Sequence, residues 1–180
     1  MIPQDFPVIS KLEAAERQLD QAIRLFFARA DAVSIHTLAT SAYQIITDIC
    51  KHKGIKREIE DSEVLEEFGI KRELLNSIRQ PQNFFKHADK DHEHTVNLNP
   101  MLTVVFMMSA VQYLLSLRPR PTAECDVFRT WFFLRLPSHR PAEIQTIVDR
   151  LPLTIDPDDY AFFGEAIATR RRQFDSERAV

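Results

Sequence analysis

The chain has 180 residues, of which 44% are hydrophobic and 27% are charged, and these values are typical of a soluble globular protein rather than of a disordered segment. Only 3 Gly stand against 10 Pro and 13 Phe. Because tight hairpin turns rely on glycine, this composition argues against a β-sandwich or barrel and favours helices. The formal net charge of -3 excludes a general positive field, so any contact with nucleic acid has to be local.

The beginning of the chain lacks the cationic segment and long apolar core of a secretory signal, so we expect a cytoplasmic protein. Cys50 and Cys125 are isolated, and we expect two ordinary buried thiols rather than a disulfide. The sequence has no glycine-rich phosphate loop, no GxSxG turn and no zinc-finger spacing. We therefore expect no cofactor.

Two amphipathic helices are predicted first. Ser10 and Glu13 have the spacing of a capping box, and apolar residues then recur every three or four positions up to Ala30. Ser34 is the expected cap of a second helix, which ends near Gly54. Because the connection between them is short, we expect the two helices to be antiparallel.

A short helix is predicted at Ser62–Phe68, and another begins near Lys71. Pro81 lacks the amide hydrogen that a helix interior needs, so we expect the helix to stop there and a new one to start with Pro81 in its first turn, running to about Ala88. The polar residues 89–97 are predicted to form a loop.

A long uncharged stretch, Leu98–Leu117, comes close to the length needed to cross a bilayer. Asn99 before Pro100 is typical of a helix start, and the stretch carries Gln112, Tyr113 and two serines. We therefore expect a central core helix and no membrane partner. A helix that is apolar on all sides needs other helices, or a partner chain, around it.

The RPRP segment that begins at Arg118 is expected to be a stiff connector. It divides the chain into a helical bundle, residues 1–117, and a C-terminal helical extension packed on it, residues 118–180. Three helices are expected in the extension: Thr122–Leu136, Pro141–Arg150, and one from Asp156 onward. We predict an all-α fold, an antiparallel helical bundle of six to eight helices with a smaller helical C-terminal part.

Residues 79–94, RQPQNFFKHADKDHEH, contain three of the six histidines. If Pro81 starts a helix, Asn83 and His87 lie one turn apart on the same face, with Lys86 on its flank. A histidine exchanges protons near neutrality, while Arg79 or Lys86 can hold an anionic phosphate. These residue types suit metal-independent cleavage at a ribose hydroxyl. The alternative is a solvated helix face without a catalytic role.

The segment NFFKHAD, on a late helix after two antiparallel helices, resembles the HEPN superfamily of helical proteins. In that superfamily an Arg, usually followed by a polar residue such as Asn, precedes a His, and the motif often carries metal-independent ribonuclease activity in a site shared across a homodimer. The resemblance implies that His87 is the catalytic histidine, that Asn83 occupies the polar position, and that the partners are RNA or a nucleotide and a second copy of the chain.

The arginine of this motif departs from the family pattern. Gln82, not Arg, stands directly before Asn83, and Arg79 is farther from His87 than the family spacing allows. The resemblance therefore implies either a variant endoribonuclease that uses Arg79 or Lys86, or a member that only binds its ligand.

The same segment allows a second interpretation, a metal site. His87, Asp91, His92 and His94 offer imidazole and carboxylate ligands, so a metal site is an alternative, although no known ligand spacing is present.

His36 and Tyr43 lie on a polar edge of the second helix and are candidate substrate-binding residues, or else hydrogen-bonded packing residues. A competing interpretation of the whole chain is a non-enzymatic helical interaction module that forms a homodimer or binds another protein.

Overall fold

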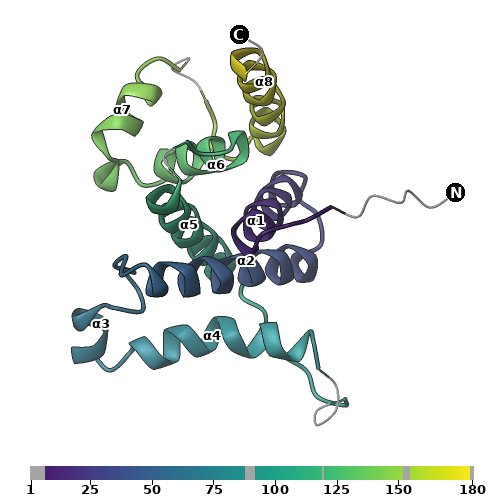
Figure 1. Ribbon diagram of the computed structural model, residues 1–180, viewed down its shortest axis with the longest axis vertical. Helices are drawn as coiled ribbons and strands as arrows, with labels where there is room; N and C mark the ends of the chain where they lie inside the picture. Colours follow the sequence, from purple (N-terminus) through teal and green to yellow (C-terminus); the bar gives the residue numbers. More distant parts are fainter. Residues whose placement is uncertain (1–6, 88–91, 119, 152–154, 179–180) are drawn as a thin grey trace, which may run out of the picture.

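The computed structural model describes residues 7–87, 92–118, 120–151 and 155–178. Within these residues the fold is entirely helical, with eight α-helices and one short 3-10 turn, which confirms the predicted all-α bundle (Figure 1). The elements are α1 (Lys11–Phe27), α2 (Ala32–His52), α3 (Glu63–Glu67), α4 (Lys71–Phe84), α5 (Pro100–Leu117), α6 (Ala123–Leu134), the 3-10 turn η1 (Pro137–His139), α7 (Ala142–Val148) and α8 (Tyr160–Arg178).

The first two helices form the predicted antiparallel pair (Figure 1). The Ser10 hydroxyl caps α1 by accepting a hydrogen bond from the Glu13 amide at 3.1 Å. The cap of α2 is Asp31 rather than the expected Ser34, because the Asp31 carboxylate accepts from the Ser34 amide at 2.8 Å and the helix begins three residues earlier than expected.

Helix α4 differs from the prediction. It runs without a break through Pro81, so the expected restart at this residue is wrong. Proline at this position removes one backbone hydrogen bond, and Pro81 itself is buried in the fold. The helix ends at Phe84, and the predicted end near Ala88 lies outside the described residues.

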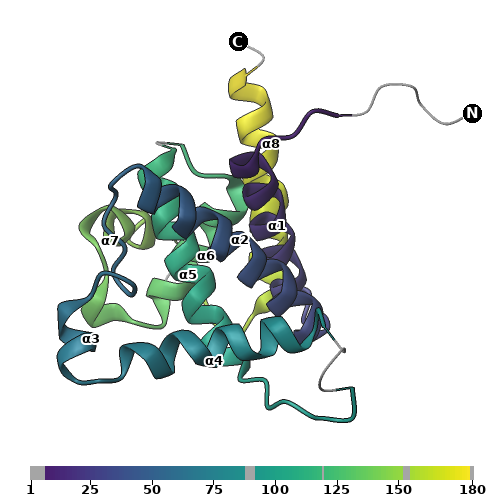
Figure 2. The same ribbon diagram turned by 60° about the horizontal axis from the view of Figure 1, so that its bottom comes forward.

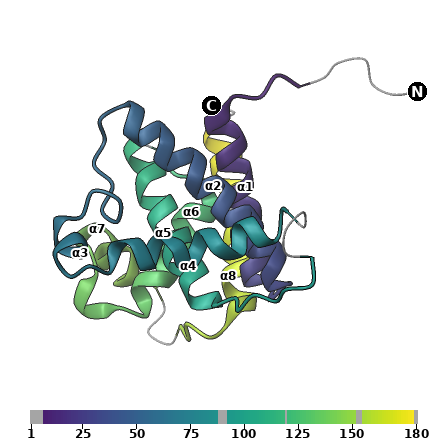
Figure 3. The ribbon, with the colours of Figure 1, turned by 90° about the horizontal axis from the view of Figure 1, so that it is seen from below.

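Helix α5 is the centre of the bundle. Its length and composition alone would allow it to cross a membrane, but half of its residues are buried within this fold. Helices α1, α2, α4 and α6 all pack against it. Seen from below, α4 lies across the face formed by α2 and α5 (Figure 3).

The C-terminal helices pack on the same core. Thr122, the first residue of an expected helix, is instead the cap of α6, because its hydroxyl accepts a hydrogen bond from the Cys125 amide at 3.2 Å. Helix α8 begins at Tyr160 instead of Asp156, because Asp156 closes a turn by accepting from the Asp158 amide, and Asp159 then accepts from the Phe162 amide. Figure 2 shows α8 running beside α1, with its last turns extending beyond the other helices.

An aromatic cluster joins α1, α6 and α8. The Phe27 and Phe163 rings are stacked with centroids 5.4 Å apart, and the Trp131 indole donates a hydrogen bond to the Pro157 carbonyl at 2.9 Å. The members of the cluster are Phe26, Phe27, Phe128, Trp131, Tyr160 and Phe163. Residues on both sides of the Arg118 connector thus share one hydrophobic core.

This cluster supplies a test of the fold. Phe128 is 0% exposed, so Phe128→Ala should lower the free energy of unfolding by about 3–5 kcal/mol through lost burial and the cavity left behind. Phe162 is 36% exposed, and Phe162→Ala is the matched control, with an expected loss of about 1 kcal/mol or less. Urea unfolding measures both, and equal losses would contradict the packing described here.

Candidate functional site

The outer face of α4 carries two of the residues that the sequence pattern singled out, Arg79 and Asn83. Asn76, Arg79, Gln80 and Asn83 recur every three or four positions and are solvent-facing in this region, opposite the buried Ile78. With Phe84 they form one wall of a hollow of about 540 Å³, and His94, Thr95 and Val96 form the other wall. We call this space the α4 hollow.

The hollow unites two of the four predicted catalytic residues with a different histidine. Arg79 and Asn83 line it together with His94. Among the described residues that line it, Arg79 is the formal cation and no carboxylate is present. The guanidinium, amides and imidazole among these described residues make a suitable environment for an anionic oxygen.

His87 and Lys86 lie beyond the end of α4. Both amides donate to the Asn83 carbonyl at 3.1 Å, so the backbone keeps a helical turn for a few residues past Phe84. Both side chains are exposed, and neither belongs to the described residues that line the hollow. The catalytic roles assigned to His87 and Lys86 stay predictions.

The metal alternative also stays a prediction. Within the described residues, no group of three or more His, Cys, Asp or Glu side chains is arranged to hold a metal ion. Asp91, one of the four candidate ligands, lies outside those residues. His92 and His94 are both exposed.

His36 is a buried residue between three helices. Its Nδ1 atom lies 2.9 Å from the Thr103 hydroxyl on α5, and its ring meets the edge of Phe85 with centroids 5.8 Å apart. Burial lowers the pKa of His36 because it disfavours the charged imidazolium, although the Ile78 carbonyl opposes this shift. His36 thus joins α2 to α5 and to the end of α4.

Tyr43 is buried one helical turn from Thr47 on the same edge of α2. Its hydroxyl donates to Glu60 at 2.5 Å, and Tyr113 on α5 donates to the other oxygen of Glu60 at 3.2 Å. Burial is the largest cause of the strongly raised pKa of Tyr43, and the hydrogen bond to Glu60 raises this pKa further. The charge of Arg79 acts weakly in the opposite direction. Neither Tyr43 nor His36 is among the residues that line the α4 hollow.

A second group of residues was missed by the sequence analysis. Asp20 on α1 accepts a hydrogen bond from the Thr122 hydroxyl at 2.6 Å, and the Cys125 sulfur lies 3.9 Å from the same carboxylate oxygen. Burial raises the pKa of Asp20 to about 7, although the Thr122 bond opposes the shift. No sequence pattern connects Asp20 with residues about a hundred positions later, so only the packing of α1 on α6 reveals this group.

Comparison of the chain with protein-family models, with curated proteins and with solved structures found no match. The HEPN resemblance therefore rests only on the segment NFFKHAD and on the two antiparallel helices that precede it.

The environment of His36 has a consequence for pH dependence. Its folded pKa is below the ordinary 6.5, so the unfolded chain takes up a proton first as the pH falls through 6.5. The stabilisation associated with neutral His36 is present above that pH and is lost below it. His36→Gln removes this titration, so the stability difference between wild type and variant should shrink from pH 7 to pH 5 in urea unfolding. Comparing the two proteins cancels the contribution of Asp20, and a constant difference would contradict the assignment.

Proposed function

We propose that this protein binds the phosphate groups of RNA or of a nucleotide in the α4 hollow. The observation that supports the proposal is the meeting of Arg79, Asn83 and His94 in one hollow whose described lining lacks carboxylates. The planar guanidinium of Arg79 suits bidentate contact with a phosphate. The net charge of the whole chain is -3, so the attraction would come from this local group rather than from the overall field.

A metal-independent endoribonuclease is the catalytic form of this proposal. His94 would take the proton-transfer role that the sequence pattern assigned to His87, and Arg79 would oppose the charge that grows on the phosphate during attack by a ribose hydroxyl. The HEPN resemblance supports this form, since the polar position of the family motif corresponds to Asn83, which lines the hollow.

A second candidate function, binding of another protein chain, is favoured by a different observation. Val64, Phe68 and Ile70 are exposed apolar side chains within seven residues, and Phe68 is 75% exposed. Neighbouring exposed apolar side chains often mark interaction sites. If no RNA or nucleotide binds, binding of another protein chain becomes the better-supported function.

Binding to a labelled single-stranded RNA tests the proposal by fluorescence anisotropy. Arg79→Ala should weaken binding about tenfold and reduce the steepness of the salt dependence by roughly one phosphate contact. Arg72→Ala is the matched control, because Arg72 is an exposed arginine on the same helix that does not line the hollow. Equal effects of the two variants would indicate nonspecific charge attraction and would contradict the proposed site.

Cleavage assays with an excess of chelator test the catalytic form. We expect cleavage to persist without divalent metal, to fall about a hundredfold or more in His94→Ala, and to change little in His87→Ala. The opposite ranking of the two histidine variants would return the catalytic role to His87. Loss of cleavage on chelation would favour the metal alternative instead.

A further inference from the structure

The α4 hollow has an apolar part as well as the polar part described above. Phe84, in the last turn of α4, is half-buried and lines the hollow, and Val96 lies on the opposite wall. Phe84 and Arg79 are five residues apart on one helix, which corresponds to about 7.5 Å along the helix axis. A single nucleotide, with its phosphate at one end and its base at the other, is long enough to contact both side chains.

The Phe84 ring is held in place by contacts that lead into the core. It meets the Phe85 ring edge to face, with centroids 6.0 Å apart. Phe85 meets the ring of the buried His36 at 5.8 Å, and His36 Nδ1 lies 2.9 Å from the Thr103 hydroxyl on α5. Edge-to-face contacts of this kind are favourable and fix the relative position of the rings. Phe84 is therefore a preorganised apolar surface at the rim of the hollow.

Three side-chain amides line the same hollow, those of Asn76, Gln80 and Asn83. An amide carries hydrogen-bond donors and an acceptor together, as the edges of nucleobases do. The described lining thus combines a cation suited to a phosphate with a ring and amides suited to a base.

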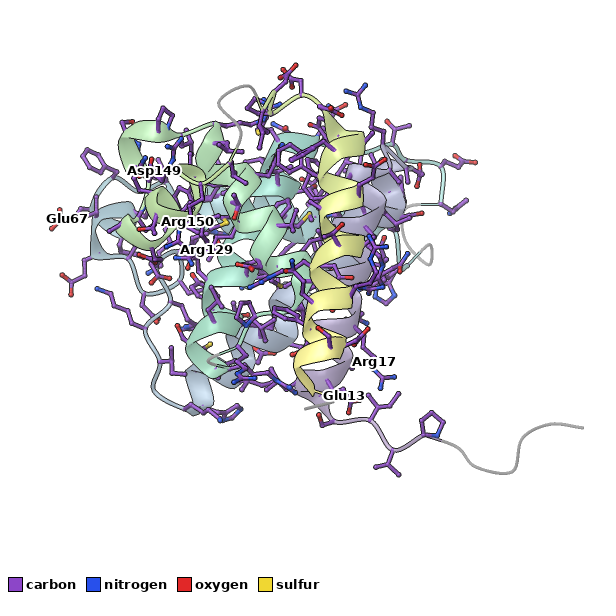
Figure 4. The ribbon with its side chains drawn as sticks, turned by 90° about the horizontal axis from the view of Figure 1, so that it is seen from above. Glu13, Arg17, Glu67, Arg129, Asp149 and Arg150 are labelled. Atoms are coloured by element: carbon purple, nitrogen blue, oxygen red, sulfur yellow. The ribbon has the colours of Figure 1, made fainter. Side chains whose placement is uncertain are left out.

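The largest of the described hollows lacks this combination. It lies between α1, the start of α6 and the last turns of α8, and its volume is about 1100 Å³. It is lined by arginines and Phe174, but also by carboxylates, with which Arg118, Arg170 and Arg171 form ion pairs. At the same end of the molecule, seen from above, Glu13 and Arg17 are paired on the first turns of α1 (Figure 4). An anionic ligand there would have to displace these carboxylates.

We propose that the α4 hollow binds one unpaired nucleotide of a single-stranded RNA, with its base stacked on Phe84 and its phosphate held by Arg79. This inference rests on the proposed phosphate-binding function and adds the base as a second contact. A base inside a duplex is covered on both faces by its neighbours, so only an unpaired base can stack on a side chain. The volume of about 540 Å³ is within the range of sites that hold one small ligand.

Charge and stacking predict opposite preferences between single strand and duplex. A duplex carries its phosphates more densely, so attraction to Arg79 alone favours the duplex. Stacking on Phe84 favours the single strand, by on the order of tenfold in Kd for one base. A preference for the single strand therefore measures the contribution of the ring.

Fluorescence anisotropy with three RNA probes of equal length tests the proposal: a single strand, its duplex, and an abasic strand that keeps the ribose-phosphate backbone. Wild type should bind the ordinary strand about tenfold more tightly than the abasic strand, and more tightly than the duplex. Phe84→Leu keeps an apolar side chain but has no ring, so it should bind the ordinary and abasic strands equally. Phe84→Tyr keeps the ring and should restore the wild-type preference.

Two further variants separate this inference from the proposed function. Phe68 is 75% exposed and does not line the hollow, so the matched control Phe68→Leu should behave as wild type with all three probes. Arg79→Ala should weaken binding of the ordinary and abasic strands by similar factors, because both carry the phosphate.

The stacking proposal is overturned, with phosphate binding intact, if Phe84→Leu keeps the wild-type preference for the ordinary strand. It is also overturned if this variant loses affinity for both strands equally. Failure of wild type to bind either strand, or equal effects of Arg79→Ala and Arg72→Ala, would instead overturn the proposed function itself.

Discussion

The burial of α5 is the constraint on which the rest of the structure depends. This helix has apolar side chains on every side, and a fold of this size can hide them only by surrounding the helix with others. Helices α1, α2, α4 and α6 supply that cover. Because α4 covers α5 and α2 with its inner face, its outer face is left to solvent with Asn76, Arg79, Gln80 and Asn83 in a row. The candidate site is thus a consequence of core packing.

The two ends of the molecule have different physical characters. At one end the α4 hollow is open and its side chains are mostly exposed, with Arg79 as the cation among its described lining residues. At the other end Glu124, Asp20 and several arginines form a compensated and partly buried network beneath α8. Figure 1 places α4 and α8 at opposite ends of the long axis. The two groups of charged side chains therefore belong to separate parts of the fold.

The histidines illustrate how far a local pattern can be trusted. Helical spacing after an expected break at Pro81 grouped Asn83 with His87. The structure instead places Arg79 and Asn83 on one continuous helix, brings His94 to the hollow and leaves His87 exposed beyond the helix end. His94 comes after the end of α4, and helical periodicity cannot predict where the chain runs once the helix has ended. The polar edge of α2 was similarly visible in the sequence, but the partners of His36 and Tyr43, which are Thr103 and Glu60, come from other elements.

The sequence by itself determined the helical class, the antiparallel first pair, the core role of the apolar stretch, the cap at Ser10 and the helix start at Asn99, since each depends on residues within a few positions of one another. The tertiary structure alone decided that α4 continues through Pro81, which is buried in the fold although it removes one backbone hydrogen bond. It also decided that Asp20 meets Thr122 and Glu124 meets Arg24 and Arg171. Contacts between distant residues depend on how helices dock, and docking is set by the shape of the whole core rather than by any local pattern.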